Sequence, residues 1–499
     1  MISEHRAMDL AARLRATLQG PPEAPAIDEA GRWWSWGALR AIADAIDVAI
    51  GESPPGAFVA LLPRNNPAHV AALFGVLASG RSVALINPMQ GAQRIAEQLG
   101  QVRPFAVLAD AADAARPELA AAGGILVALD SATRPASVTV VARGAAPAAE
   151  AAPQSLSLLT SGTTGPSKRI TLTAASLLAA AEDCALVEAE GAEPDGRLPV
   201  FVSGYPLTNI GGIYYTLPSG VTGRRMAMIE KFAVADWVAA VERNRPGLLW
   251  LPPAAVRMVL DAGVPQAALA SARALRFGSA PLEEAALDRF EALYGIPVLA
   301  QYGATEFAGT VTAMTLADRL RFGTAKRRSV GRARPGIGLR VVDAATGAVL
   351  PADAVGQLQV LAPRVASEWL PTSDLARLDA DGFLFIEGRA DDAINRGGFK
   401  VLPEEVAAVL RRHPAIADAV VIGLPDARLG AVPAAAVELR AGVEPPSEAA
   451  LLGFARDHLV AYQVPSRILV VAALPRTVSL KVDRPAARRL LEATAADGA

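Results

Sequence analysis

The sequence has a single cysteine, Cys184, and only four histidines among its 499 residues. One cysteine excludes an internal disulfide and disfavours a cysteine-based metal site. We interpret Cys184 as a small buried residue, because no histidine in its local sequence would activate it as a nucleophile. No two histidines have the spacing of metal ligands and none lies in a chemical motif, which disfavours a Ser-His-Asp hydrolase. This cysteine usage favours a reducing, cytoplasmic location.

The sequence also lacks an excess of either charge, since 48 basic and 50 acidic residues leave a net charge of −2. Without a basic excess, we expect no nucleic-acid partner. No run of about 18 uninterrupted apolar residues is present, so we expect no membrane span. The first residues mix charged with apolar side chains and lack the continuous apolar core of a secretory signal.

Apolar residues are abundant, at 52% of the chain, and they form alternating strand-like and helix-like runs. GAFVALL, PAHVAALFGVLASG and RSVALINP predict a strand, a helix and a strand, and FAVLAD and GILVAL continue the pattern. This alternation predicts an α/β fold in which helices cover layered, parallel-rich sheets.

The C-terminal part of the sequence has a different texture. VLPEEVAAVLRRHP and SEAALLGFARDHL predict helices, while ADAVVIGLPD and AVPAAAVELR predict strands. A chain of 499 residues also exceeds the size at which one core usually splits. We therefore predict a large N-terminal domain, 1–390, and a small, mobile α+β C-terminal domain, 391–499.

A Gly/Ser/Thr-rich motif, LTSGTTGPSK, occupies Leu159–Lys168 at the end of the apolar run SLSLL. Its glycines let backbone N–H groups converge on an anion, its hydroxyls add donors, and Lys168 adds a positive charge. The spacing differs from the Walker pattern, so a P-loop NTPase is not indicated. The alternative interpretation is a flexible linker, although a pattern that ends in lysine after an apolar run is unusual for one.

The second motif, QYGATE at Gln301–Glu306, follows the strand-like IPVLA. The ring of Tyr302 suits stacking on a base, Thr305 suits donation to a phosphate, and Glu306 offers the hard oxygen that Mg²⁺ prefers. Alone, the motif is equally compatible with a Tyr-Gly turn and a solvated glutamate. Earlier in the chain, RFGSAPL ends another strand-like run with small residues that would let a planar ligand approach the backbone.

Two further candidates lie nearer the C-terminus. PTSDLARLDADGFLFIEGRADD carries Asp374 and Arg389, and its DADG predicts a hairpin turn between two strands. A carboxylate such as Asp374 is a natural acceptor for two ribose hydroxyls. Lys481 lies in a polar segment between ILVVAALP and PAARRLLEA, where the ordinary alternative is a solvent-exposed lysine.

In this order and at these separations, the motifs resemble those of the adenylate-forming superfamily, which includes acyl-CoA synthetases, peptide-synthetase adenylation domains and luciferases. The resemblance covers essentially the whole chain and is closest in style to aryl- and acyl-CoA ligases such as chlorobenzoate-CoA ligase. It implies that a carboxylate attacks the α-phosphate of Mg·ATP, giving acyl-AMP and pyrophosphate. The small domain would then rotate about a hinge, and an acceptor nucleophile would take the acyl group.

The resemblance assigns roles residue by residue. Thr305 would contact the α-phosphate, Glu306 would hold Mg²⁺, and Lys481 would bridge the carboxylate and the α-phosphate oxygens, while Asp391 would be the hinge. ATP and AMP would be bound by Thr160, Ser161, Gly162, Thr163, Thr164, Gly165, Lys168, Gly278, Ser279, Ala280, Tyr302, Gly303, Asp374 and Arg389. The acid would lie against Phe201–Tyr215 and the QYGATE motif, with candidates Tyr205, Asn209, Gly211, Gly212 and Ala304.

The chain departs from the pattern of these ligases at several positions. Leu480 stands where they usually carry a glycine before the catalytic lysine, and Asn209 stands where an aryl-CoA ligase has a histidine. In chlorobenzoate-CoA ligase, cationic and aromatic residues hold the CoA nucleotide. Here their places are taken by Met89, Leu429, Gln463 and Val464. Losing charge-assisted contacts should weaken CoA binding.

These departures favour an amide bond synthetase, in which a free amine attacks acyl-AMP directly. An aryl- or acyl-CoA ligase, and an enzyme that loads a carrier-protein thiol, stay open as alternatives, so the use of CoA is undecided. A non-catalytic nucleotide-binding relative is disfavoured by the intact set of Lys168, Glu306, Asp374, Arg389 and Lys481. The segment Phe201–Tyr215 contains no Lys or Arg, which favours an aryl or otherwise uncharged acid over an amino acid.

Overall fold

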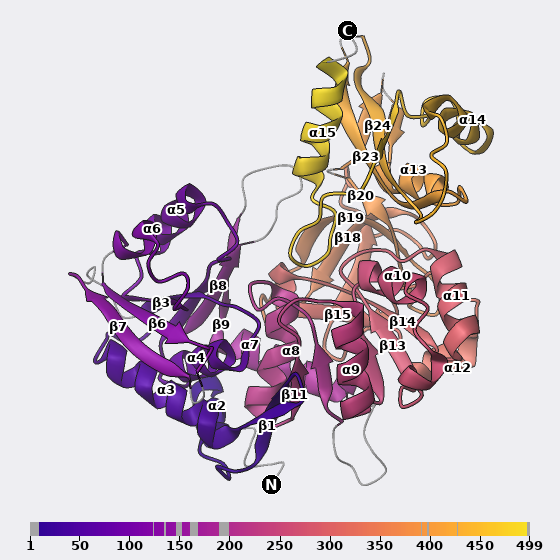
Figure 1. Cartoon of the computed structure of the whole chain (residues 1–499). Helices are drawn as coiled ribbons and strands as arrows, with labels where there is room; N and C mark the ends of the chain where they lie inside the picture. Colours follow the sequence, from indigo (N-terminus) through magenta and orange to yellow (C-terminus); the bar gives the residue numbers. More distant parts are fainter. Residues whose placement is uncertain are drawn as a thin grey trace. The chain divides into compact units, whose positions relative to one another are not determined.

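The computed structural model describes residues 9–496 except 123, 134–135, 146–151, 160–167, 189–198, 391, 397–398 and 427. The chain divides into two compact units (Figure 1). The first comprises the described residues of Met1–Ser161, Ser167–Ala325 and Ala362–Ser367. The second comprises those of Lys326–Leu361 and Glu368–Ala499.

Among the described residues of the first unit, a seven-stranded sheet has the order β7-β6-β5-β3-β4-β8-β9. The five central strands pair in parallel, and an antiparallel strand closes each edge. The strands are β3 Phe58–Leu62, β4 Ser82–Leu85, β5 Ala106–Asp110, β6 Ile125–Asp130, β7 Ser137–Arg143, β8 Ser155–Leu159 and β9 Arg169–Thr173. This arrangement confirms the predicted parallel-rich sheet, because strands buried on both faces read as continuous apolar runs.

The described residues of the same unit form two further strand groups, with helices beside them. One runs β12-β13-β14-β15 and the other β10-β11-β1-β2. The strands are β1 Pro25–Glu29, β2 Arg32–Ser35, β10 Phe201–Ser203, β11 Met226–Met228, β12 Leu248–Trp250, β13 Ala274–Phe277, β14 Val298–Ala304 and β15 Gly309–Ala313. The helices of the unit are α2 Leu10–Leu18, α3 Trp36–Ile50, α4 Pro67–Ala78, α5 Ala92–Val102, α6 Pro117–Ala120, α7 Ala174–Glu188, α8 Ile210–Thr222, α9 Val234–Asn244, α10 Pro253–Asp261, η2 Gln266–Leu269, α11 Glu284–Tyr294, η3 Thr305–Phe307 and α12 Leu316–Phe322.

The second unit contains two sheets among its described residues. An antiparallel sheet has the order β17-β18-β19-β20, and another has the order β22-β21-β24-β23 with β25 beside β24. The strands are β16 Arg332–Ala333, β17 Gly338–Val342, β18 Gly356–Leu361, β19 Leu370–Leu378, β20 Leu384–Arg389, β21 Ile394–Arg396, β22 Phe399–Val401, β23 Ile416–Asp426, β24 Gly430–Leu439 and β25 Ile468–Val471. The helices are α13 Pro403–Leu410, α14 Glu448–His458 and α15 Arg484–Ala496.

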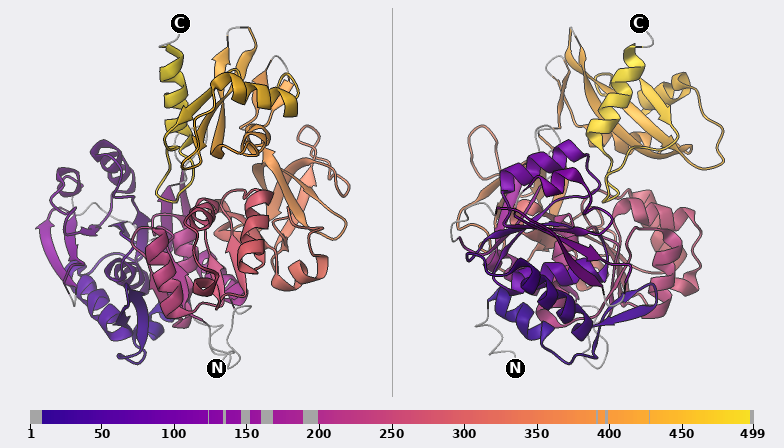
Figure 2. Two further views of the ribbon diagram at one scale, coloured as in Figure 1. Left: turned by 45° about the vertical axis from the view of Figure 1, so that its right-hand side comes forward. Right: turned by 60° about the vertical axis from the view of Figure 1, so that its left-hand side comes forward.

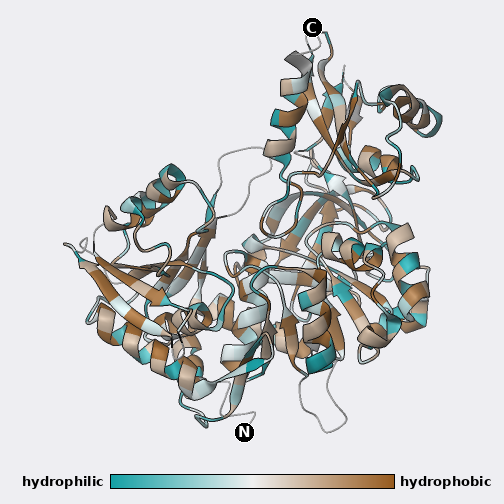
Figure 3. Cartoon of the chain, viewed as in Figure 1, coloured by the Kyte–Doolittle hydropathy of each residue, from teal (hydrophilic) through white to brown (hydrophobic). Residues whose placement is uncertain are grey.

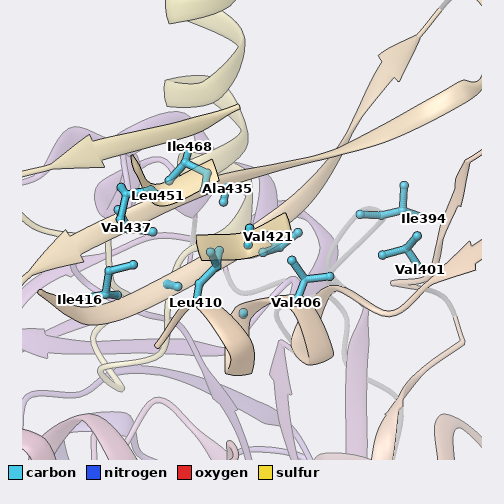
Figure 4. Packing of buried hydrophobic residues seen from close by; sticks show 13 residues of the cluster. Ile394, Val401, Val406, Leu410, Ile416, Val421, Ala435, Val437, Leu451 and Ile468 are labelled. Atoms are coloured by element: carbon cyan, nitrogen blue, oxygen red, sulfur yellow. The ribbon is translucent and has the colours of Figure 1, made fainter. Parts of the chain in front are cut away.

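Alternating residues of β23 explain how the C-terminal sheet is covered on both faces. Val421 packs with residues of α13 and α14, such as Leu410 and Leu451 (Figure 4). Its neighbour Val420 packs with Leu491 of α15, because successive side chains of a strand point to opposite faces. Figure 2 shows α15 along one side of this sheet, and the strands are drawn mainly in hydrophobic brown (Figure 3).

The fold class is therefore the predicted one, with an α/β first unit and the predicted helix and strand segments in the C-terminal part. Strands β17–β20 group with the C-terminal residues rather than with the first unit. The domain boundary at residue 391 stays a prediction, since residue 391 lies outside the described residues. No helix in the described part of the chain has the length and apolarity needed to cross a bilayer.

Candidate active site

Two parallel strands bring the predicted adenine-binding residues to one edge of a sheet. β13 pairs with β14 in parallel, with Phe277 opposite Ala300. The chain leaves β13 through Gly278, Ser279 and Ala280, and β14 continues beyond Ala300 into the QYGATE motif. Ligands of parallel α/β sheets bind beyond the carboxyl ends of the strands. The two segments therefore meet at the sheet edge where ligands of such folds bind, and their contact with a nucleotide stays a prediction.

The segment after β13 has an unusual backbone. Ser279 has a φ of +74°, in the left-handed region that a non-glycine residue seldom adopts. Ser279 and Ala280 are both exposed. A strained, exposed segment of this kind is common at ligand-binding sites, where the surrounding structure holds the strain.

The glycines of these segments are required by the protein's own packing. A Cβ on Gly303 would lie 2.2 Å from the carbonyl oxygen of Gly309 on the neighbouring strand β15. A Cβ on Gly278 would lie 2.9 Å from Cγ of Gln301. The predicted contact of both glycines with adenine stays a prediction, but close packing within the sheet already excludes a side chain at Gly303.

The last two residues of the motif lie in the short connection between β14 and β15. Thr305 is half-buried and Glu306 is exposed, both in the 3₁₀ turn η3. The amide of Ala308 donates to the carbonyl of Thr305 at 3.0 Å and closes the turn. A hydroxyl and an exposed carboxylate are thus presented together at the end of β14.

The donor set suits a magnesium ion shared with phosphates. No group of three His, Cys, Asp or Glu residues gathers to hold a metal within the part of the chain that the structure describes. Mg²⁺ commonly binds through one or two carboxylates, with substrate phosphates and waters completing its octahedron. The single carboxylate of Glu306 fits this kind of site.

The predicted ribose-binding residues are partners in the second unit. Asp374 on β19 lies opposite Arg389 on β20 in the antiparallel register. The Arg389 guanidinium donates to Ser373 Oγ at 2.5 Å, and the amide of Asp374 donates to Thr372 Oγ1 at 3.0 Å. The DADG segment forms the predicted hairpin, in which Gly382 has a φ of +79°.

Lys481 lies in a small closed loop that precedes α15. Arg476 and Val482 form an isolated antiparallel bridge across the loop. Inside it, the amide of Thr477 donates to the carbonyl of Lys481 at 2.8 Å, and that of Leu480 donates to Thr477 at 2.9 Å. Leu480 has a φ of +61°, so the residue directly before Lys481 has a left-handed backbone.

The loop carries the side chain of Lys481 at its surface. This side chain is exposed to solvent, yet surrounding protein atoms and, secondarily, the cation of Arg389 lower its pKa below the ordinary lysine value. The cations of Lys481 and Arg389 repel each other. An anionic ligand in this region would be attracted by both groups. The arrangement is suited to holding a phosphate or carboxylate.

The Gly/Ser/Thr-rich motif connects two paired strands. Leu159 at the end of β8 lies opposite Arg169 at the start of β9, and Lys168 is exposed between them. Residues Thr160, Ser161, Gly162, Thr163, Thr164 and Gly165, and the hinge candidate Asp391, lie outside the described residues. Their roles stay predictions.

The predicted acid-binding segment leads from β10 into α8. Asn209 is half-buried at the N-cap of α8 and makes no side-chain capping bond there. A Cβ on Gly211 would touch the Tyr205 ring at an ordinary 3.4 Å, whereas one on Gly212 would lie 2.1 Å from the Pro206 carbonyl oxygen. Gly212 is therefore needed for the turn into α8, while Gly211 has room beside an aromatic ring.

A cluster of aromatic rings is centred on Tyr215 and includes Tyr205, and its member Trp250 comes from a separate segment of the chain. The Tyr215 ring centroid lies 4.8 Å from that of Tyr205, 4.7 Å from that of Trp250 and 5.4 Å from that of Phe201. Burial raises the pKa of Tyr205 and Tyr215 above the ordinary tyrosine value, so both hydroxyls are neutral. The side-chain amide of Gln301, next to Tyr302, hydrogen bonds to the Tyr215 hydroxyl.

Two buried arginines lie against the same rings. Arg276 of β13 is fully buried and donates to the carbonyl of Met314 at 2.9 Å, with its guanidinium carbon 5.5 Å from the Trp250 ring centroid. The guanidinium of Arg224 lies 4.8 Å from the Phe201 ring centroid, and burial lowers its pKa to about 10. Arg276 interrupts the apolar strand sequence ALRF. A charged residue within such a strand was the sequence feature that could have indicated a buried polar contact.

Comparison with known proteins decides the family. The family described as AMP-binding enzyme matches residues 14–370, and the AMP-binding enzyme C-terminal domain matches residues 405–481. The chain belongs to the AMP-binding enzyme family. This confirms the predicted adenylate-forming superfamily and makes the protein an AMP-forming ligase that activates an acid with ATP.

Three relatives illustrate what this AMP-binding enzyme is similar to. The 4-coumarate–CoA ligase-like 5 protein of Oryza sativa subsp. japonica is 30% identical over 463 residues, which cover 90% of this chain and 82% of that protein. The fatty acid–[acyl-carrier-protein] ligase ScoC of Streptomyces coeruleorubidus is 28% identical over 500 residues, covering 93% of each. The structure of the amide bond synthetase McbA from Marinactinospora thermotolerans covers 96% of this chain and 99% of its own, with a TM-score of 0.79; at 24% identity it shows the fold alone.

Proposed function

We propose that this enzyme activates an aryl carboxylic acid as acyl-AMP and passes the acyl group to an amine, forming an amide. In the first half-reaction, a carboxylate oxygen bonds to the α-phosphorus of Mg·ATP and the bond to the β-phosphate oxygen breaks, releasing pyrophosphate. In the second, the amine nitrogen bonds to the acyl carbon, loses a proton and displaces AMP.

The residues described above take the following parts in the proposal. Glu306 would hold Mg²⁺, which would supply positive charge against the phosphates of ATP, and Thr305 would donate to the α-phosphate. Lys481 lies between the carboxylate and the α-phosphate and offsets the charge of two anions brought together, the kind of preorganised electrostatics that often dominates catalysis. Asp374 and Arg389, partners across β19 and β20, hold the ribose.

The observation that carries the amide assignment is the chemistry at the positions expected to bind the CoA nucleotide. Met89 is 76% exposed and carries no charge. Gln463 donates to Glu405 Oε2 at 3.2 Å, so its amide serves an internal contact. Val464 packs against the core of the C-terminal sheet. None of these side chains supplies a cation for a phosphorylated nucleotide, and Leu429 supplies no aromatic ring.

The proposed acid is aromatic because its predicted segment lies among aromatic rings. Tyr205 and Tyr215 offer flat apolar faces, and offset or tilted ring pairs are favourable at the observed separations. We further propose that the protein acts in the cytoplasm, and that the small domain 391–499 moves about Asp391 between the two half-reactions.

Two other acceptors are competing proposals, each favoured by a relative. The rice relative is named as a CoA ligase-like protein and would point to a thioester with CoA. The Streptomyces relative is named as a ligase to an acyl-carrier protein, and a carrier thiol needs no CoA nucleotide site. All three acceptors share the first half-reaction.

Product mass spectrometry tests the proposal. The enzyme is incubated with ATP, Mg²⁺ and a panel of aryl acids, and CoA, simple amines or a phosphopantetheinylated carrier protein are added in parallel. Amide formation with amines and no thioester with CoA is the expected result. Efficient thioester formation with CoA or the carrier would overturn the amide assignment and leave acid adenylation intact.

A further inference from the structure

The guanidinium of Arg364 holds both sides of the turn that follows Thr305 and Glu306. Its Nε donates to the carbonyl of Phe307 at 2.9 Å, and its Nη2 donates to that of Thr310 at 2.5 Å. The side chain is 8% exposed. A planar guanidinium presents several donors in a fixed fork, which allows one side chain to hold two carbonyls at once.

The turn that Arg364 holds has a strained backbone. Ala308 has a φ of +57° and Gly309 a φ of +125°, both outside the conformations that L-residues prefer. An alanine in the left-handed region persists only when its surroundings impose that conformation. The two carbonyls bound by Arg364 belong to the residues on either side of Ala308 and Gly309.

Asp183 of α7 places and neutralises the guanidinium. Its Oδ2 lies 3.5 Å from Nη1 of Arg364 and accepts from the Tyr214 hydroxyl at 3.4 Å. The Tyr214 ring lies directly on the turn, since a Cβ on Gly309 would be 2.2 Å from its Cδ2. Burial keeps the pKa of Tyr214 well above the ordinary value, so its hydroxyl stays a donor.

The main chain of Arg364 is fixed from the same helix. Ser176, in the first turn of α7, donates from Oγ to the carbonyl of Arg364 at 2.6 Å. The segment itself is a closed turn, in which the amide of Ala366 donates to the carbonyl of Ala362 at 3.0 Å. Helix α7 therefore fixes Arg364 at both its backbone and its charged end.

We propose that Arg364 is a positioning residue for adenylation, acting through the turn to set Thr305 and Glu306 where they meet the α-phosphate and Mg²⁺. The proposal rests on the function proposed above. A carboxylate that must share a metal ion with a nucleotide gains from a fixed backbone, because small misplacements of a catalytic group cost large factors in rate.

The test compares Arg364→Lys with Arg364→Met and with a matched control, Arg319→Lys. Arg319 of α12 also forms a partly buried ion pair, with Glu291 of α11 at 2.8 Å, and Glu291 is not one of the predicted site residues. Lysine keeps the charge beside Asp183 but lacks the planar fork that holds two carbonyls in a fixed geometry. We expect Arg364→Lys to lower kcat for acid-dependent ATP–pyrophosphate exchange about tenfold, Arg364→Met to lower it further, and Arg319→Lys to leave it unchanged.

A double-mutant cycle with Glu306→Gln separates positioning from general destabilisation. If Arg364 acts through the turn, Arg364→Lys should cost the Glu306→Gln enzyme clearly less than the tenfold loss in the wild type, because residues that act as a unit are not additive and only the positioning of Thr305 is left to lose. A full tenfold loss in that background would overturn the proposal, and so would equal losses in Arg364→Lys and Arg319→Lys at equal thermal midpoints.

A second measurement requires no acid substrate: ATP binding to the enzyme is measured by calorimetric titration, with and without Mg²⁺. Mg²⁺ should strengthen ATP binding to the wild type several-fold and strengthen it less in Arg364→Lys. Equal strengthening in both proteins would overturn the positioning role. If the wild type binds Mg·ATP but none of the tested acids supports pyrophosphate exchange, the result would instead count against the proposed function. The two failures are therefore distinguishable.

Discussion

Arg476 donates a hydrogen bond of 2.8 Å from Nη2 to Oδ2 of the buried Asp418 on β23. Arg476 begins the loop that carries Lys481, so this bond anchors the loop to the C-terminal sheet. The other oxygen of Asp418 accepts from Arg411 at 3.0 Å. The carboxylate is 5% exposed, and two cations balance its charge away from water.

Replacing Asp418 with asparagine should weaken this anchor. We expect Asp418→Asn to lower the free energy of unfolding by about 3 kcal/mol, as breaking a buried ion pair does, and to lower kcat for pyrophosphate exchange about tenfold by loosening the Lys481 loop. Asp28→Asn is the control, because Asp28 is 2% exposed and bound by Asn244 at 2.7 Å in the first unit. Asp28→Asn should lower the free energy of unfolding but leave kcat for pyrophosphate exchange unchanged. If Asp28→Asn and Asp418→Asn lower kcat for exchange equally, the anchoring role is contradicted.

Removing the lysine itself should affect only the first half-reaction. Lys481 is exposed, so Lys481→Ala should fold as the wild type does. We expect pyrophosphate exchange to fall a hundredfold or more, on the order of the loss of one preorganised contact. Transfer from synthetic acyl-AMP to the acceptor should continue. The exposed Lys231 gives the control variant, and a Lys481→Ala enzyme that exchanges at the wild-type rate would remove the proposed mechanism.

Much of this molecule could be predicted from local patterns. The apolar runs gave β3 and β4 of the parallel sheet, and DADG gave the turn between β19 and β20. The motifs gave Asp374 and Arg389, which the structure places opposite each other. Such features are readable because periodicity and turn residues act over a few positions of the chain.

Other features depend on contacts between distant segments and leave no local trace. Arg364 donates to the carbonyl of Phe307, and its own carbonyl accepts from the hydroxyl of Ser176; the two partners belong to different parts of the sequence. Gly303 reads as a ligand-facing glycine, but the backbone of β15 is what excludes its side chain. Leu480 could be recognised as a departure from the usual glycine, whereas its left-handed φ needed the structure.

Leu480 offers a direct test of backbone strain beside the catalytic lysine. Its φ of +61° disfavours any L-residue, by roughly 1–2 kcal/mol. Glycine would relieve this strain and would lose about 0.5–1 kcal/mol to chain entropy, so Leu480→Gly should change stability little. Leu480→Val should be clearly less stable than wild type in urea unfolding, because a β-branched residue is a genuine outlier at this φ. Equal stability of the two variants would contradict the left-handed conformation.

Adjacent glycines at the start of α8 give a matched pair for the acid site. Gly212→Ala would force a Cβ to 2.1 Å from the Pro206 carbonyl oxygen and should cost about 1–3 kcal/mol of stability, as overpacking does. Gly211→Ala meets the Tyr205 ring at 3.4 Å and should leave stability unchanged. If the acid lies beside that ring, Gly211→Ala should raise KM for bulky aryl acids in the exchange assay. An unchanged KM for every acid would place the acid elsewhere.

His69 predicts a pH dependence of stability that has no part in catalysis. It is fully buried in α4, where Nδ1 lies 2.8 Å from Oδ1 of Asn66. Burial lowers its pKa from 6.5 to about 4, so the folded protein holds the ring neutral where the unfolded chain binds a proton. The free energy of unfolding is therefore not reduced by His69 well above pH 6.5. As pH falls from 6.5 toward 4, protonation of the unfolded chain lowers that free energy by about 1.4 kcal/mol for each pH unit.

His69→Leu should remove this part of the acid sensitivity. We expect the wild type to lose about 1.5 kcal/mol more than His69→Leu when urea unfolding is compared at pH 6.5 and pH 5. The difference between the two proteins is the relevant quantity, because carboxylates titrate in both. His458→Gln is the control, since His458 lies exposed at the end of α14 and its replacement should keep the wild-type dependence. If the free energies of unfolding of wild type and His69→Leu have the same pH dependence, folding does not lower the pKa of His69, and the prediction is wrong.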